Sequence, residues 1–361
     1  MKKDRLIPAV VVLVVLAAVV TWVCRKVHFD VLEVGKQVSH ANWWMIASGI
    51  ACIFVAYLFR SARWAMLLRH NKKVSALSLT GTQVIGFTAV ALIGRLADPV
   101  RPVLVAKKTG LPVSQQVAVY IVERLFDMGS MALVVSMALL PLPADVILKS
   151  SSHSKLVMHM AATHPDLAVA FARFGGLGLT LCGALFLVVV RFSGETVAKI
   201  FESLLTPLSK NVAHSVAKKI RAFHSGLDTM RSLSDVAITA GLSVAMWLLI
   251  AGAYFLTCAS FTASPELAAI SPSKCVLLMV WSGTASIFQL PIIGWFSQIF
   301  LVAGGLTGIL GCTAEAATAC AAALLLVTFL CVIPVGLIWA QFENINLRTI
   351  AAESGKTEVE E

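Results

Sequence analysis

Six apolar blocks, each about as long as a bilayer is thick, constrain this chain more than any other feature. A helix rises about 1.5 Å per residue, so roughly 20 apolar residues cross the hydrocarbon layer. Helices also pair their backbone N–H and C=O groups internally, which hydrocarbon requires. We therefore predict membrane-spanning helices at residues 6–24, 43–59, 117–140, 174–190, 236–258 and 316–339.

The composition supports a protein that lies in the membrane over most of its length. Of 361 residues, 58% are hydrophobic and only 13% are charged, against roughly 25% charged residues in a soluble domain. We predict an all-α integral membrane protein with about six regular transmembrane helices and two broken or re-entrant regions, an arrangement that inverted repeats can produce. Residues 1–340 form the membrane domain, including a cytoplasmic amphipathic segment at 193–235, and 341–361 form a polar, disordered tail.

Basic residues lie mostly between the apolar blocks, where they set the orientation of the spans in the membrane and contact the lipid bilayer. We therefore attribute the net charge of +10 to these two roles and expect no nucleic-acid partner. Segment 60–73 holds five basic residues and no acidic one, and segment 193–235 holds six basic residues. Both segments and both termini are expected in the cytoplasm. The eight cysteines form no Cys-x-x-Cys pair and no Cys/His cluster, so no metal and no cofactor is expected.

Two apolar regions, 77–105 and 274–312, are interrupted by glycine and proline, and the first also contains charges. Interrupted segments are tolerated at membrane depth where protein or a water-filled cavity surrounds them, and pairs of broken helices form the substrate site of many transporters. The alternative is that the glycines let helices pack closely. For the second region both interpretations stay open, whereas the charges of the first region favour a site.

Ionisable side chains in apolar surroundings supply the candidate substrate-binding residues, because a charge at the bilayer centre costs at least about 2.5 kcal/mol on insertion scales. They fall into three groups along the chain. The candidates are Arg60, Arg63, Arg95, Asp98, Arg101, Glu123, Arg124 and Asp127. For the first group, Arg60 and Arg63 beside Trp64, the alternative is that arginines at the end of a span snorkel to the interface.

The second group places Arg95, Asp98 and Arg101 three residues apart, between the glycine-spaced apolar stretch and two prolines. Two guanidiniums and one carboxylate leave a positive charge that suits bidentate capture of a phosphate. The alternative is a cytoplasmic turn with a surface salt bridge.

The third group, Glu123, Arg124 and Asp127, lies on one helix face within an apolar run. These side chains must face the bundle interior or a cavity. The alternative is a structural network of ion pairs with the arginines of the other groups.

Three motifs resemble, in order and spacing, those of the membrane region of lysylphosphatidylglycerol synthases, a flippase-like family. They are Arg60-Ser-Ala-Arg-Trp64, the stretch from Gly94 to Pro102, and Val122-Glu-Arg-Leu-Phe-Asp127. The resemblance covers roughly residues 5–340. It implies a flippase of the bacterial inner membrane that moves an anionic or aminoacylated phospholipid, a glycolipid or a polyprenyl lipid between leaflets.

On this hypothesis, the arginines of the second motif capture the phosphate, those of the first steer it, and the charged residues of the third line or gate the path. A cationic headgroup would instead pair with Glu123 or Asp127. Full synthases add a soluble aminoacyltransferase domain, and because this chain ends soon after its last span we expect no enzyme activity. Family members often carry a glutamate after a glycine-rich turn where this chain has Gln298, which puts ion coupling in doubt.

Two other classes of function remain open. One is a non-transporting membrane subunit that docks a separate lipid-modifying enzyme, for example through 195–235. The other is an intramembrane enzyme that uses Glu123 and Asp127 as acid and base, which is the weakest alternative because no nucleophile or metal set accompanies them. A homo-oligomer is compatible with the sequence.

Overall fold

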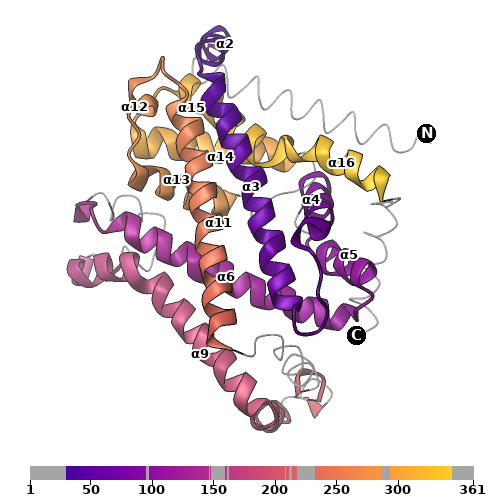
Figure 1. Cartoon of the computed structure of the whole chain (residues 1–361). Coiled ribbons are helices and arrows are strands. Elements are labelled where there is room, and N and C mark those ends of the chain that lie inside the picture. Colours follow the sequence, from indigo (N-terminus) through magenta and orange to yellow (C-terminus); the bar gives the residue numbers. More distant parts are fainter. Residues whose placement is uncertain are drawn as a thin grey trace, which may run out of the picture.

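The computed structural model describes residues 30–94, 97–145, 147, 159–160, 162–207, 209–210, 214–217, 232–285 and 293–343. Every regular element in these residues is a helix (Figure 1). The elements are α2 (Val31–Ser39), α3 (Trp43–Leu68), α4 (Ala76–Ile93), α5 (Val100–Thr109), α6 (Val113–Leu139), α9 (Pro165–Leu205), α11 (Leu233–Ala259), α12 (Pro265–Ala268), α13 (Pro272–Ala285), α14 (Ile293–Leu310), α15 (Ala314–Leu325), the π-helical turn η5 (Leu326–Leu330) and α16 (Val332–Phe342).

Four helical stretches are long and apolar enough to cross a membrane: Trp43–Leu68, Ala76–Ile93, Ser234–Ala259 and Ala314–Phe342. The chain is thus an all-α, multi-pass membrane protein, as predicted. Three of these stretches contain the predicted spans 43–59, 236–258 and 316–339, while 117–140 and 174–190 lie largely or wholly within the long helices α6 and α9. The predicted span 6–24, most of the tail 341–361 and much of the segment 193–235 lie outside the described residues.

The first irregular region is less broken than its glycines suggested. Gly81 and Gly86 lie within α4, which runs without interruption to Ile93. They permit close packing instead, because a Cβ at Gly81 would collide with the indole of Trp339 and a Cβ at Gly86 with the side chain of Arg101. The break comes only at Gly94, whose φ of 90° ends the helix.

The second irregular region forms two helices, α13 and α14, on either side of residues 286–292. Pro291, the proline that interrupts this region, therefore lies outside the described residues. Gln298 is buried in α14, a helix that packs against α13 and α15.

An antiparallel pair of helices, α3 and α11, forms the centre of the bundle (Figure 1). At one end the backbone N–H of Asn42 donates to the Ser260 carbonyl at 2.8 Å, and at the other end Arg69 pairs with Asp235. Side chains also cap both N-termini: Asn42 accepts from the first turn of α3, and Ser232 forms a capping box with Asp235 at the start of α11. The pair is therefore fixed at both ends.

The last span, Ala314–Phe342, is irregular in its middle. The π-helical turn Leu326–Leu330 lies between α15 and α16, and Pro334 follows in α16. Beyond it, α16 crosses α4 so closely that a Cβ at Gly336 would collide with Thr88 Oγ1 and lie 3.1 Å from the Val84 carbonyl oxygen. The crossing therefore depends on a residue without a side chain.

Candidate functional site

The turn between α4 and α5 brings Arg101, a member of the second group of charges, back into the bundle. Gly94 ends α4, and Pro99 caps α5, with Pro102 in the first helical turn, where a missing N–H costs nothing. This reversal lays α5 against α4, and the side chain of Arg101 occupies the space that Gly86 leaves open. Arg101 is completely buried as a result.

Arg63 joins three helices through its guanidinium. Its Nη1 lies 2.6 Å from Asp127 Oδ1 on α6 and donates to Ser243 Oγ on α11 at 2.7 Å. Its Nη2 lies 2.8 Å from Glu123 Oε1. Because the Arg63 side chain is only 1% exposed, these contacts take the place of water at Nη1 and Nη2, while Nε has no hydrogen-bond partner among the described residues.

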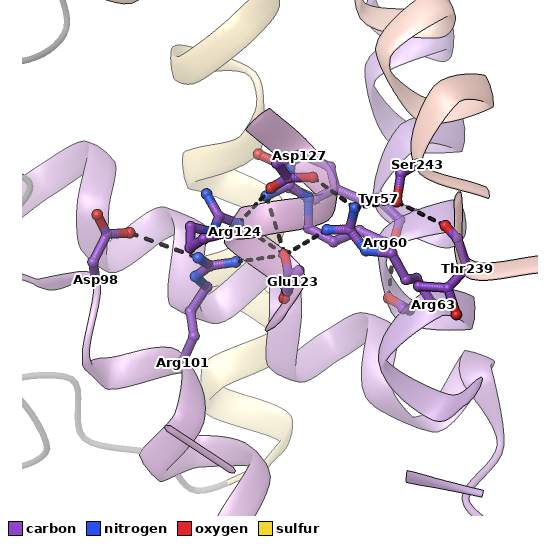
Figure 2. A network of polar contacts seen from close by, with 11 residues as sticks. Tyr57, Arg60, Arg63, Asp98, Arg101, Glu123, Arg124, Asp127, Thr239 and Ser243 are labelled. Carbon is purple, nitrogen blue, oxygen red and sulfur yellow. Dashed lines mark hydrogen bonds and ion pairs between the residues drawn. The ribbon is translucent and has the colours of Figure 1, made fainter. Parts of the chain in front are cut away.

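Glu123 is the centre of the charged cluster (Figure 2). It is fully buried, and a single oxygen, Oε1, faces four guanidiniums. The distances are 2.8 Å to Arg63 Nη2, 2.8 Å to Arg124 Nη2, 3.5 Å to Arg101 Nη1 and 3.7 Å to Arg60 Nη1. Arg124 Nη2 also lies 2.9 Å from Asp127 Oδ2. We call these residues the arginine network: Arg60, Arg63, Arg101, Glu123, Arg124 and Asp127.

Two aromatic rings each lie next to two of the guanidiniums. Arg60 and Arg101 lie 4.4 and 4.5 Å from the ring centroid of Phe87. Arg101 and Arg124 lie 4.9 and 5.1 Å from that of Tyr120. A cation over a ring face is attracted by the ring quadrupole, most strongly where water is excluded. The stacking therefore offsets part of the repulsion between neighbouring arginines.

The arginine network carries a surplus of positive charge. Its four guanidiniums face two carboxylates, and a third carboxylate, Asp98, lies 3.8 Å from Arg101 Nη2, which leaves one positive charge. Arg60 and Arg101 are the least neutralised members, because among the described residues Arg60 has one ion pair, at 3.7 Å, and Arg101 has two, at 3.5 and 3.8 Å. Of these two, Arg101 is the more deeply buried. Its Nε and Nη2 have no hydrogen-bond partner among the described residues. The network thus holds donors and charge suited to an anion.

Comparison with known proteins identifies the family. The family model described as "Lysylphosphatidylglycerol synthase TM region" matches residues 9–336 of the chain. The chain belongs to this family. No curated protein matches the chain, and no solved structure matches it either. The three motifs that predicted the family supply every member of the arginine network.

The structure brings together six of the eight predicted residues, those of the arginine network. Asp98 lies at its edge, in the turn before α5 with its side chain 21% exposed. Arg95 lies outside the described residues. The snorkelling alternative for Arg60 and Arg63 is wrong, because both are buried and paired inside the bundle. Whether these residues bind a substrate stays a prediction.

Sequence reasoning missed the partners that complete the arginine network. Phe87 and Tyr120 stack on its arginines, and Ser243 accepts a hydrogen bond from Arg63. A serine and an aromatic side chain are ordinary within a membrane span, so neither residue stands out by type. One signal was available: Thr239 and Ser243 are small polar residues four apart in a span without charge.

Proposed function

We propose that the chain moves a lipid with an anionic headgroup between the two leaflets, and that the arginine network binds the phosphate of that headgroup. The observation that carries this proposal is the buried surplus of positive charge in the arginine network, together with the unpartnered donors of Arg101. A buried charge without full compensation is costly in a membrane protein and typically marks a substrate pathway. A phosphate would satisfy both the charge and the donors.

An anionic group fits this network better than an ammonium group. Both carboxylates of the network are already engaged by arginines: Glu123 by four, and Asp127 by Arg63 and Arg124. Glu123 Oε2 has no hydrogen-bond partner among the described residues, but an ammonium bound there would lie inside a site of positive charge, next to the guanidiniums on Oε1. An aminoacylated lipid would therefore bind through its phosphate, with the amino group held elsewhere.

The network would receive headgroups from the cytoplasmic leaflet of a bacterial inner membrane. Arg63 lies six residues before Arg69, or about 9 Å along the helix, and Arg69 begins the exposed basic turn between α3 and α4. Basic turns face the cytoplasm, and we place both termini on that side. The role assigned to the network is binding and release, so the chain itself would catalyse no covalent step.

The rival function, docking of a separate lipid-modifying enzyme through segment 195–235, makes a different prediction. A docking subunit needs no buried surplus charge and no open arginine donors. In liposomes it would move none of a panel of anionic, aminoacylated and polyprenyl lipids, although it folds. Movement of any of them by the wild-type protein favours the transport proposal.

Arg101 supplies the direct test. We expect Arg101→Gln to reduce the transfer of a fluorescent phosphatidylglycerol between leaflets of proteoliposomes by at least about 10-fold, because loss of the guanidinium removes the open donors. Arg101→Lys keeps the charge and loses the planar fork, so it should fold like the wild type yet transport several-fold more slowly. Dithionite quenching of the outer leaflet measures the rate.

Lys73→Gln is the matched control. This substitution removes the same charge as Arg101→Gln, but from an exposed residue of the basic turn. Its transfer rate should stay within about twofold of the wild-type rate. A wild-type rate for both Arg101 variants would exclude Arg101 as the phosphate ligand.

A further inference from the structure

One face of α11 continues the arginine network across the bundle. Thr239, Ser243 and Trp247 are spaced four residues apart, so they lie on successive turns, about 6 Å apart along the axis. Ser243 joins this strip to the network, because it accepts a hydrogen bond from Arg63 at 2.7 Å (Figure 2). We call these three residues the α11 strip.

The hydroxyl of Thr239 is unsatisfied although the residue is completely buried. Threonines in helices of this protein typically donate to the carbonyl four residues earlier: Thr257 donates to Ala253 O, and Thr318 to Ala314 O, each at 2.7 Å. The equivalent bond from Thr239 is missing. A buried hydroxyl that bonds neither its own helix nor a described neighbour is available to a ligand.

Trp247, one turn beyond Ser243, also has a buried polar group without a hydrogen-bond partner among the described residues, its indole Nε1. Other tryptophans of the bundle satisfy this donor: Trp64 donates to Gln116 Oε1 at 3.1 Å, and Trp295 to the Ala91 carbonyl at 3.1 Å. A buried indole N–H usually finds a partner. Two unpartnered polar groups therefore flank the serine that contacts the network.

The chemistry of the α11 strip suits neutral hydroxyl groups. Thr239 offers a donor and an acceptor, Trp247 offers a donor, and α11 has no carboxylate after Asp235. Asp235 itself is engaged by Arg69 and His70 at the helix start. An ammonium group would find no counter-charge along the strip and would lie beside the Arg63 guanidinium.

We propose that the α11 strip binds an uncharged polyol, such as glycerol or a sugar, attached to the phosphate that the arginine network holds. This inference rests on the proposed function and narrows its substrate class. Lipids with a phosphate-linked polyol would be preferred over phosphatidic acid, which lacks the polyol, and over lysylphosphatidylglycerol, which adds ammonium groups.

The test removes single polar groups from the strip and varies the headgroup. Thr239→Val replaces the hydroxyl with a methyl group, and Trp247→Phe removes the indole N–H. We expect each variant to slow the transfer of phosphatidylglycerol in proteoliposomes by about 5- to 10-fold, so that its rate approaches the slower rate of phosphatidic acid. The transfer rate of phosphatidic acid itself should not change. Thr318→Val and Trp44→Phe are matched controls, since Thr318 bonds its own helix and Trp44 is exposed.

The outcomes separate this inference from the function on which it rests. If the wild-type protein moves none of the three lipids, the transport function itself fails, and the inference with it. The polyol site is wrong, while transport stands, if the wild-type protein moves phosphatidic acid or lysylphosphatidylglycerol as fast as phosphatidylglycerol. The same conclusion follows if Thr239→Val and Trp247→Phe slow all three lipids equally. A slowing confined to phosphatidylglycerol supports the site.

Discussion

Glu123→Gln is expected to lower the free energy of unfolding by about 3–5 kcal/mol, the usual cost of removing one partner from a buried ion pair. Glutamine preserves the shape of the side chain but removes the negative charge that four guanidiniums share. The surplus of the cluster then rises from one positive charge to two. Arg63 and Arg101 are too deeply buried for water to compensate. Unfolding in mixed micelles, followed by tryptophan fluorescence, measures the loss.

Glu33→Gln provides the comparison for this result. Glu33 pairs with Lys36 at 3.1 Å on the exposed face of α2, where its side chain is 40% exposed. A surface pair of this kind contributes about 0–1 kcal/mol. Equal stabilities of the two variants would mean that Glu123 Oε1 does not balance the arginines.

Gly336→Val should separate α16 from α4 and cost about 3 kcal/mol, the upper end of the usual range for overpacking. The added carbon would collide with Thr88 Oγ1 and come within 3.1 Å of a backbone oxygen, and a backbone cannot rotate away as a side chain can. Thr88 would also lose its hydrogen bond to the Val332 carbonyl at 3.3 Å. A lower unfolding temperature in detergent reports the effect.

Gly304→Val introduces the same side chain where there is room. Gly304 is an exposed residue of α14, and no neighbouring atom lies within 4 Å of the point that its Cβ would occupy. Its unfolding temperature should remain close to that of the wild type. A Gly336→Val protein as stable as this control would show that α4 and α16 do not cross closely.

The charged residues of the site could be predicted from sequence because their cost in hydrocarbon makes them conspicuous. Glu123 and Asp127 interrupt an apolar run, and the free-energy cost of burying their charges is lowest opposite arginines. The sequence could not assign partners, since Glu123 faces arginines from three different helices. Such pairings depend on how helices cross, and spacing along one helix contains no information about that.

Glycines were harder to interpret than charges. Gly81, Gly86 and Gly94 look alike in the sequence, yet only Gly94 ends a helix, while the other two receive side chains from α16 and α5. A helix break and a close helix crossing both favour glycine, so composition cannot distinguish them. The α11 strip was missed for a related reason: an unpaired hydroxyl is recognised only when its surroundings are known.

The bonds between α3 and α11 bear on how such a protein could open alternately to each side. These helices are joined at three positions along their length: by Asn42 with Ser260, by Arg63 with Ser243, and by Arg69 with Asp235. A pair held in this way would act as a fixed wall, and the rearrangement would fall to the helices around it. If α6 moves, the contacts of Arg63 with its carboxylates must break, so passage of a headgroup and exchange of salt bridges would be one event.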